Sequence, residues 1–277
     1  MKPVRVLGAN LPVSRLGEGA FWDRASGSLF WVDIVGQVVS RFEIESRKHE
    51  SWTLPKPVSF AYPNDGRLVL CLSDGVYDFD PTTGDLETVA ALTLPSEHRL
   101  NDGKLDPEGR LWVGTINTSD QPQATAALYL LNDARLDEIE GGYVNANGKT
   151  WSPDGKILYH ADTARGTIWQ YDYNLATGEI SNKRVFVRNE SWHPDGLCTD
   201  TAGSVYAAIY GGSRVDLFDR RGDLQRSLAL PVPNPTSCVI GGETDSQLFV
   251  TSACDGMSPE QLAHAPLSGQ VFVMDLD

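Results

Sequence analysis

Short apolar runs recur along the chain, and patterns with the period of a helix are scarce. Each run is rich in β-branched and aromatic residues and is bounded by Gly, Pro, Asp or Asn, which is typical of β-strands. Six such runs follow one another at roughly the forty- to fifty-residue spacing of propeller blades. They are Leu29–Asp33, Leu68–Leu72, Leu111–Thr115, Leu158–Asp162, Val205–Ile209 and Leu248–Ser252.

A tight turn precedes each run, and further strands follow it. Most of these turns contain a glycine, as in Pro107–Gly109 and Pro153–Gly155, and glycine supplies the positive φ that hairpin turns need. Gly75–Phe79 and Arg184–Val187 are examples of the third and fourth strands that come after a run. Four strands in each of six units predict an all-β fold, a six-bladed β-propeller that takes up residues 1–277 as a single domain.

The two ends of the chain predict how the ring closes. The last unit ends at Gln270–Met274, with almost no chain left for a fourth strand, whereas Val4–Leu7 is a spare strand ahead of the first unit. We expect this N-terminal strand to complete the sixth blade, which would hide an open sheet edge. The alternative is a two-sheet β-sandwich, which is less favoured because sandwich strands do not recur as four-strand units.

Polar residues occupy one column of the repeat. Asn101, Asn147 and Asp195 each lie eight residues before the turn glycine of their blade, and Glu18 lies nine before its own. This position is where the innermost strand of a blade begins, at one end of the central channel. Four oxygen-bearing side chains from blades one, three, four and five therefore converge on one axis, whereas blades two and six offer only serine or threonine there.

The column predicts a metal site. Two carboxylates that lie close together repel one another unless a positive charge lies between them, and no lysine occupies an equivalent position. Glu, Asp and Asn oxygens suit hard cations such as Ca²⁺, Mg²⁺ or Mn²⁺. Each residue alone also suits a local turn, since Asn-Gly and Asp-Gly pairs are common turn formers. The joint occurrence in one column favours the metal.

The composition limits the kinds of molecule that the protein is expected to bind. The formal net charge is −14, from 37 acidic and 23 basic residues, and such a field repels nucleic acid and anionic membrane surfaces. We therefore expect a neutral or cationic small-molecule ligand. The four cysteines form no CxxC pair, which argues against a disulfide framework. The N-terminus shows no signal-peptide pattern and no apolar run approaches the ~18 residues of a membrane span, so we expect a cytoplasmic protein; its oligomeric state is open.

Longer stretches resemble the senescence-marker-protein/gluconolactonase family of regucalcin-like sugar lactonases, in order through nearly the whole chain. Among them are Leu16–Gly19, Phe30–Asp33, Arg99–Lys104, Trp151–Lys156, Pro194–Gly196 and Asp255–Met257. The resemblance implies a six-bladed propeller with one divalent cation (Ca²⁺, Zn²⁺, Mg²⁺, Mn²⁺ or iron(II)) that hydrolyses an aldonolactone. The family's metal-binding Glu, Asn and Asp fall on Glu18, Asn147 and Asp195, and its substrate-contacting Arg and Asn fall on Arg99 and Asn101.

Two positions depart from the family pattern. Ser119 falls where some relatives have an acidic residue that contacts sugar hydroxyls, and we assign it to the substrate site. Lys149 follows Asn147-Gly148, where relatives usually have an apolar residue. Lys149 either points into the pocket to bind the substrate or faces solvent at its rim. Both departures affect the identity of the substrate, and the metal prediction does not depend on them.

The residues also support a hypothesis for the chemistry. Asp195 is the expected general base, Arg99 the donor to sugar hydroxyls or to developing negative charge, and Asn101 the residue that orients the substrate. His193 competes for the role of base, and the sequence leaves its position open. An organophosphate triesterase and a non-catalytic calcium-binding or scaffold propeller are the rivals. Arg99 and Asn101 favour an enzyme, because a pure ion binder does not need them.

Overall fold

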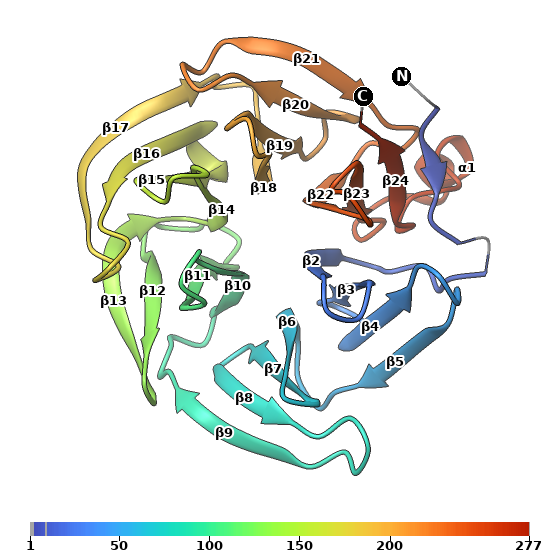
Figure 1. Cartoon of the computed structure of the whole chain (residues 1–277), viewed down its shortest axis with the longest axis horizontal. Coiled ribbons are helices and arrows are strands. Elements are labelled where there is room, and N and C mark those ends of the chain that lie inside the picture. The colour runs from blue at the N-terminus through green and yellow to red at the C-terminus, as the bar shows by residue number, and fades with distance from the viewer. Residues whose placement is uncertain (1–2, 9, 277) are drawn as a thin grey trace.

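Six four-stranded antiparallel sheets stand around a central axis in the computed structural model, which describes residues 3–8 and 10–276 (Figure 1). Each sheet begins with an innermost strand at the channel and ends with a fourth strand at the outer rim. The predicted all-β six-bladed propeller is thereby confirmed. Within the described residues, no helix is long and apolar enough to cross a membrane.

The blades follow one another in chain order. The first three comprise β2 (Gly17–Asp23), β3 (Ser28–Asp33), β4 (Val38–Glu43) and β5 (His49–Thr53); β6 (Val58–Asn64), β7 (Arg67–Leu72), β8 (Gly75–Phe79) and β9 (Leu86–Ala91); and β10 (His98–Leu105), β11 (Leu111–Asn117), β12 (Ala126–Asn132) and β13 (Arg135–Tyr143). The fourth and fifth comprise β14 (Ala146–Trp151), β15 (Ile157–Asp162), β16 (Thr167–Tyr173) and β17 (Ile180–Arg188), and then β18 (Pro194–Thr199), β19 (Val205–Ile209), β20 (Arg214–Phe218) and β21 (Leu224–Ala229).

The sixth blade joins the two ends of the chain. It contains β22 (Pro235–Gly241), β23 (Gln247–Ser252), β24 (Phe272–Asp275) and, as its outermost strand, β1 (Arg5–Val6). β1 pairs antiparallel with β24, and the Arg5 guanidinium contacts the Asp275 carboxylate at 3.0 Å. The expected closure by the N-terminal strand is confirmed, and the edge of β24 is covered as a result.

Apolar side chains fill the space between neighbouring blades. Phe30 and Val32 of β3, for example, belong to one buried cluster with Val58, Leu70 and Leu72 of the second blade. Successive strand residues point to opposite faces, so the β-branched and aromatic runs in the sequence supply both faces of each buried sheet. Close packing of this kind makes the innermost strands a rigid frame for whatever lies in the channel.

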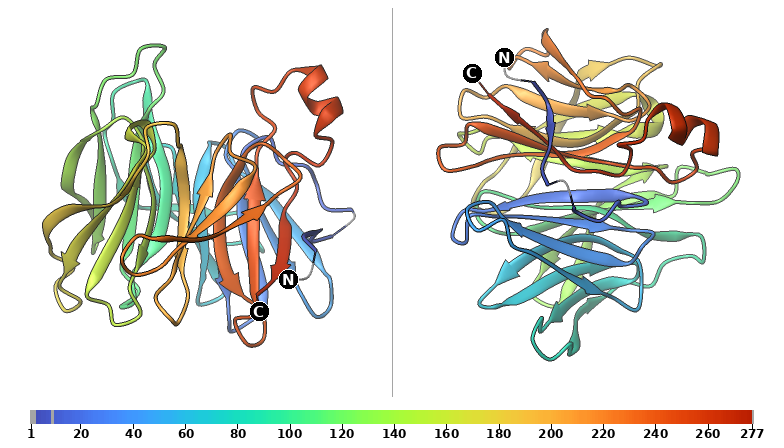
Figure 2. Two further views of the ribbon diagram at one scale, coloured as in Figure 1. Left: turned by 90° about the horizontal axis from the view of Figure 1, so that it is seen from above. Right: turned by 90° about the vertical axis from the view of Figure 1, so that its right-hand side faces the viewer.

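One helix was not expected from the sequence. α1 (Pro259–His264) lies between β23 and β24 and projects from one end of the propeller (Figure 2). Its start has a capping box, because the Ser258 side chain accepts from the Gln261 amide while the Gln261 side chain accepts from the Ser258 amide. Pro259 occupies the first turn, where its missing N–H costs nothing. A single turn of 3₁₀ helix, η1 (Thr163–Arg165), follows β15.

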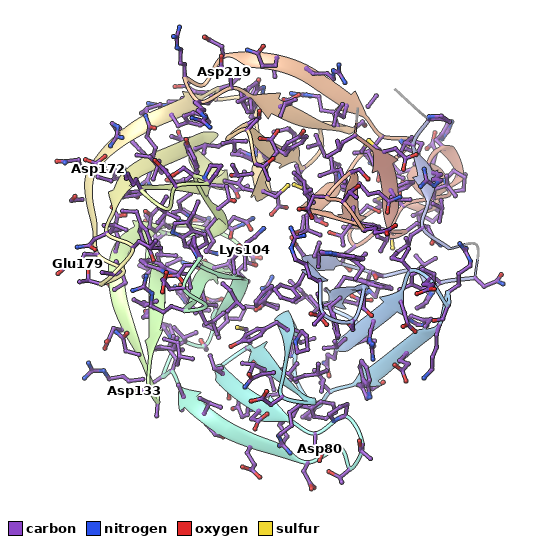
Figure 3. All side chains as sticks on the ribbon, in the orientation of Figure 1. Asp80, Lys104, Asp133, Asp172, Glu179 and Asp219 are labelled. Carbon is purple, nitrogen blue, oxygen red and sulfur yellow. The ribbon has the colours of Figure 1, made fainter. Side chains whose placement is uncertain are left out.

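Charged residues labelled in Figure 3 lie at different distances from the channel. Lys104 lies close to the axis, whereas five labelled carboxylates lie around the outside of the ring: Asp80, Asp133, Asp172, Glu179 and Asp219 (Figure 3). These acidic residues are on the outer strands and turns, in contact with water. They account for part of the net charge of −14 without placing that charge at the channel.

A bulge recurs in every innermost strand. The pairing register shifts between Glu18 and Phe21 in β2, and at the equivalent place in β6, β10, β14, β18 and β22. A bulge bends its strand and re-aims the side chains it contains. All four residues of the polar column lie within or at the edge of such a bulge, which is how the fold presents them at the channel.

Candidate functional site

A pocket of about 380 Å³ lies where the bulged strands meet. Its volume is in the range of small-molecule sites. It brings together five of the residues predicted from the sequence, which are Glu18, Arg99, Asn101, Asn147 and Asp195. The other residues that line it are Leu16, Ile116, Asn145, Thr163, His193 and Tyr210.

The Asn147 side chain is held so that its oxygen stays free. Its amide nitrogen donates to the Thr163 hydroxyl at 3.1 Å, and that hydroxyl donates to the Pro194 carbonyl at 2.8 Å. In the part of the chain that the structure describes, neither Asn147 Oδ1 nor Asp195 Oδ1 has a hydrogen-bond partner, although both are buried. A buried polar atom without a partner is costly, so two such oxygens in one pocket point to a missing cationic or hydrogen-bonding group.

Glu18 adds a second buried carboxylate. It is 6% exposed, and its Oε2 accepts from the Gly19 amide at 3.1 Å. Burial and, next, the charge of Asp102 raise the pKa of Glu18 to about 8. Burial and then the charge of Glu18 raise the pKa of Asp195 well above its ordinary value. The two groups therefore cannot both ionise at neutral pH unless a cation compensates them.

These groups fit a divalent cation. Glu18 and Asp195 offer carboxylate oxygens and Asn147 offers an amide oxygen, a donor set that suits a hard ion. Over residues 3–8 and 10–276, no group of three or more His, Cys, Asp or Glu side chains is placed to hold a metal. The amide oxygen of Asn147 is therefore an essential part of this candidate site.

Arg99 and Asn101 form another part of the wall. The Arg99 guanidinium donates to Asn101 Oδ1 at 2.8 Å and to the Leu100 carbonyl at 2.9 Å. The Asn101 amide nitrogen then donates to Asn145 Oδ1 at 2.7 Å. Burial lowers the pKa of Arg99 to about 10, against the opposing effect of Glu18 and Asp195. Arg99 thus keeps its positive charge at neutral pH, in an orientation fixed by this chain of hydrogen bonds.

Two residues assigned to the substrate lie elsewhere. Lys149 has no exposed side-chain surface, and its ammonium group contacts the Asp102 carboxylate at 2.6 Å. It is therefore neither in the pocket wall nor at a solvent-facing rim, which differs from both expectations. Ser119 is partly buried, with its amide donating to Asn117 Oδ1 at 3.1 Å, and it is not among the lining residues. His193, which the sequence left open, does line the pocket.

Several lining residues were missed by the sequence analysis. Thr163 and Tyr210 come directly after the second strands of blades four and five, and Ile116 lies near the end of β11 in blade three. In an antiparallel blade, the end of the second strand lies beside the start of the innermost strand. The residues just after each of the six apolar runs were therefore a usable signal, in addition to the polar column.

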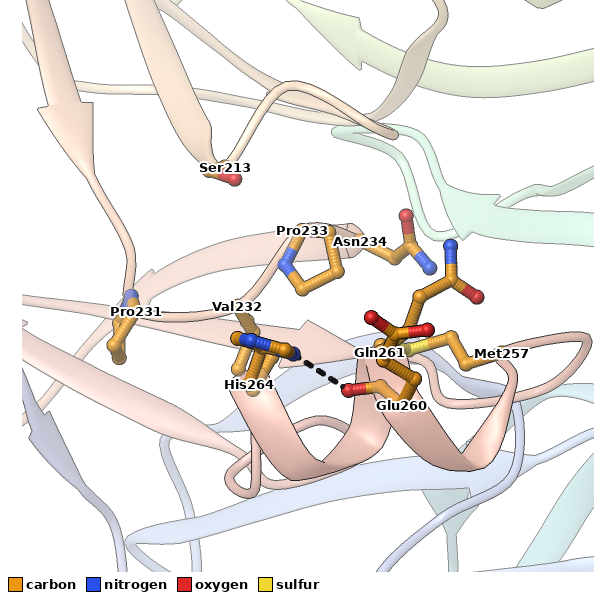
Figure 4. A pocket seen from close by; sticks show the side chains of 10 residues that line it. Ser213, Pro231, Val232, Pro233, Asn234, Met257, Glu260, Gln261 and His264 are labelled. Carbon is orange, nitrogen blue, oxygen red and sulfur yellow. Dashed lines mark hydrogen bonds between the residues drawn. The ribbon is translucent and has the colours of Figure 1, made fainter.

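A second cavity lies beside α1. It measures about 430 Å³ and is lined by Ser213, Pro231, Val232, Pro233, Asn234, Met257, Glu260, Gln261, His264 and Ala265 (Figure 4). The His264 ring contacts the Glu260 carbonyl at 2.8 Å within the helix itself. None of the candidate metal, catalytic or substrate residues predicted from the sequence lines this cavity. The buried carboxylates and the unpaired oxygens belong to the channel pocket, which we take as the functional site.

The fold and the site together define a class of protein: a six-bladed propeller with buried carboxylate and amide oxygens around one channel pocket. Residues 16–254 match the family described as "SMP-30/Gluconolactonase/LRE-like region". The chain belongs to this family, which confirms the resemblance seen in the sequence.

Individual relatives cover almost the whole chain. Regucalcin from Oryctolagus cuniculus is 35% identical over an alignment of 268 residues, with 92% of this chain and 89% of that protein covered. The structure of a calcium-binding protein, regucalcin, from Agrobacterium tumefaciens has a TM-score of 0.93 at 26% identity, covering 99% of this chain and 94% of that one. A luciferin-regenerating enzyme has a TM-score of 0.90 at 29% identity, with coverage of 98% and 94%.

Proposed function

We propose that this protein hydrolyses a sugar lactone to the corresponding aldonic acid, with one divalent cation held by Glu18, Asn147 and Asp195. The observation that carries the proposal is the pair of unpartnered buried oxygens, Asn147 Oδ1 and Asp195 Oδ1, beside the Glu18 carboxylate. Membership of a family whose description includes gluconolactonase supports the choice of a lactone. The cation, when bound, would polarise the lactone carbonyl and lower the pKa of bound water.

The protein's own groups would carry the proton transfers. Asp195 takes a proton from the attacking water, since its Oδ1 has no hydrogen-bond partner in the described structure. The water oxygen bonds to the carbonyl carbon, the bond from that carbon to the ring oxygen breaks, and the proton passes to the ring oxygen, which becomes a hydroxyl. The products are a carboxylic acid, ionised at neutral pH, and the opened sugar chain.

Arg99 and Asn101 would bind and orient the lactone. Arg99 is the one Lys or Arg among the described residues that line the pocket, and its guanidinium can donate to sugar hydroxyls or to developing negative charge. The hydrogen bonds of Asn101 to Arg99 and Asn145 leave little freedom for this wall to move. A pre-arranged wall places the lactone with a small entropic cost.

A lactone panel tests the proposal. Metal-free protein, prepared with a chelator, is reloaded separately with Ca²⁺, Zn²⁺, Mg²⁺ and Mn²⁺, and proton release is followed with a pH indicator on several aldonolactones. We expect turnover that disappears with the chelator and returns with a metal. A metal that binds without any lactone being opened would favour the calcium-binding or scaffold alternative.

A further inference from the structure

A buried ion pair lies beside the pocket without taking part in its wall. The Lys149 ammonium contacts Asp102 Oδ2 at 2.6 Å and donates to the Asp102 carbonyl at 2.9 Å. The two side chains are 0% and 6% exposed. A buried charge that loses its partner strongly destabilises the folded state. Each residue therefore depends on the other, and the pair links β10 of blade three to β14 of blade four.

The pair lies in the same bulges as the polar column. Asp102 directly follows Asn101, and Lys149 comes two residues after Asn147. The residue after Asn147 is Gly148, where an added Cβ would collide with the Asp195 carbonyl oxygen. Blade four therefore has no room for a side chain at this position. In blade three the equivalent residue is an aspartate, so blade three adds a carboxylate at this level of the channel.

The charge of Asp102 acts on both carboxylates of the pocket. It raises the pKa of Glu18, second only to burial, and it also raises the pKa of Asp195. Asp102 directly follows Asn101 and its partner Lys149 comes two residues after Asn147, so the ion pair adjoins two residues that line the pocket. The ammonium of Lys149 lies against the Asp102 carboxylate at 2.6 Å. Of the two Asp102 carboxylate oxygens, Oδ2 is the one that the lysine occupies.

We propose that the Asp102–Lys149 pair is a positioning and charge-setting element of the metal site. Lys149 holds the Asp102 carboxylate as a neighbour of the cation and prevents it from becoming a ligand. When a cation is bound by Glu18, Asn147 and Asp195, the coordination positions that these residues do not fill would thereby stay open to water and lactone. This inference rests on the proposed function, because it requires a cation in the pocket.

The two partners should shift metal affinity in opposite directions. Lys149→Met removes a positive charge and releases a carboxylate, so the cation should bind about tenfold more tightly while kcat falls, because the freed carboxylate competes with water and lactone. Asp102→Asn removes a negative charge and should weaken binding about tenfold. A pair with only a structural role would weaken binding in both variants. Changes in metal affinity of opposite sign in the two variants therefore distinguish a charge-setting role from a purely structural one.

Calorimetric titration of metal-free protein with Ca²⁺ and with Mn²⁺ measures these affinities, with unfolding temperature recorded alongside. Asp102→Asn/Lys149→Met, which removes both charges, should bind the cation within about threefold of wild type. If Lys149→Met does not fold, this double variant still decides, because it should bind more tightly than Asp102→Asn alone. The exposed Lys156→Met is the matched control and should not differ from wild type.

The outcomes distinguish this inference from the proposed function. Wild type that binds neither ion would overturn the proposed function itself. Wild type that binds, with both single variants weakened or with the double variant weaker than Asp102→Asn, would overturn the role of the pair and leave the metal site in place. A rise in affinity for Lys149→Met with a fall for Asp102→Asn would support the pair as a charge-setting element.

Discussion

Two pairs of blades can be compared at the channel: blades four and five, and blades two and six. Their backbones are alike there, but their polar side chains differ in whether they have hydrogen-bond partners. All four innermost strands shift register at the same level. In blade two, the Ser59 hydroxyl donates to the Cys71 carbonyl at 3.2 Å, and in blade six the Ser237 hydroxyl accepts from the Ala20 amide at 3.3 Å. The protein itself satisfies these hydroxyl groups.

Blades four and five differ within the same bulges, at the residues Asn147 and Asp195. Within the described structure, Asn147 Oδ1 and Asp195 Oδ1 are buried and have no partner. Native proteins leave few buried polar atoms unpaired, and such exceptions are common at binding sites. The comparison shows that a bulge in the innermost strand is not enough to create a metal-binding site. The decisive difference is a set of oxygens that the fold presents to the channel and does not satisfy.

The largest expected effect is that of Asp195→Asn, which makes blade five resemble the satisfied blades. The change removes a charge while keeping the shape. We expect loss of metal retention and a fall in turnover of about a thousandfold. The metal-free variant should unfold at a higher temperature than metal-free wild type, because two buried carboxylates no longer repel one another. Kinetics and thermal unfolding measure both; a variant that opens lactones normally would contradict the assignment.

Competition between protons and the metal ion for the Glu18 carboxylate should give the next largest effect. Burial raises the pKa of Glu18 from 4.5 to about 8, so the folded metal-free protein keeps a proton that the unfolded chain releases. Stability of the metal-free protein should therefore fall as pH rises from about 5 to about 8. Metal affinity should rise over the same window, by up to about tenfold per pH unit. Unfolding and titration at several pH values check this.

The control for this pH dependence is Glu18→Gln, which has no proton to lose at that position. Its metal-free stability should depend less on pH across the same window. Saturation of wild type with metal should also flatten the curve, because the cation replaces the proton. Identical curves for wild type, Glu18→Gln and metal-loaded protein would contradict the assignment of the buried charge.

Thr163→Val tests a residue that would not bind the cation itself but orients Asn147, one of the proposed metal ligands. Its hydroxyl holds the Asn147 amide nitrogen at 3.1 Å and thereby directs Asn147 Oδ1. Loss of such support around a metal ligand typically weakens metal binding by about tenfold or more. Calorimetric titration measures the change, with Thr163→Ser as the matched control that keeps the hydroxyl. Equal affinities for Thr163→Val and wild type would show that Asn147 needs no such orientation.

The smallest effects are expected in the satisfied blades. Ser59→Ala and Ser237→Ala each remove a hydroxyl that bonds only within the protein. Unfolding free energy should fall by about 1 kcal/mol, and metal affinity should stay within about twofold of wild type. Chemical unfolding and calorimetry measure the two quantities. A large loss of metal affinity in either variant would extend the site into blades two or six.

The repeat and the polar column were visible in the sequence because both depend on local spacing. The distance from a turn glycine is enough to place Asn101, Asn147 and Asp195 at the same level, and fold closure follows from a missing strand. The surroundings of Lys149 were not visible, because its partner Asp102 comes from another blade and the packing of both depends on tertiary structure. Thr163 was missed because the column follows innermost strands only.

The position of the cation is the most direct test of the whole account. Crystals of metal-free protein soaked in Mn²⁺ would give an anomalous difference map in which the metal is identified by its own scattering. We predict one strong peak within about 2.5 Å of oxygens from Glu18, Asn147 and Asp195. A channel without a peak after saturating soaks, or a peak only in the cavity beside α1, would contradict the central claim.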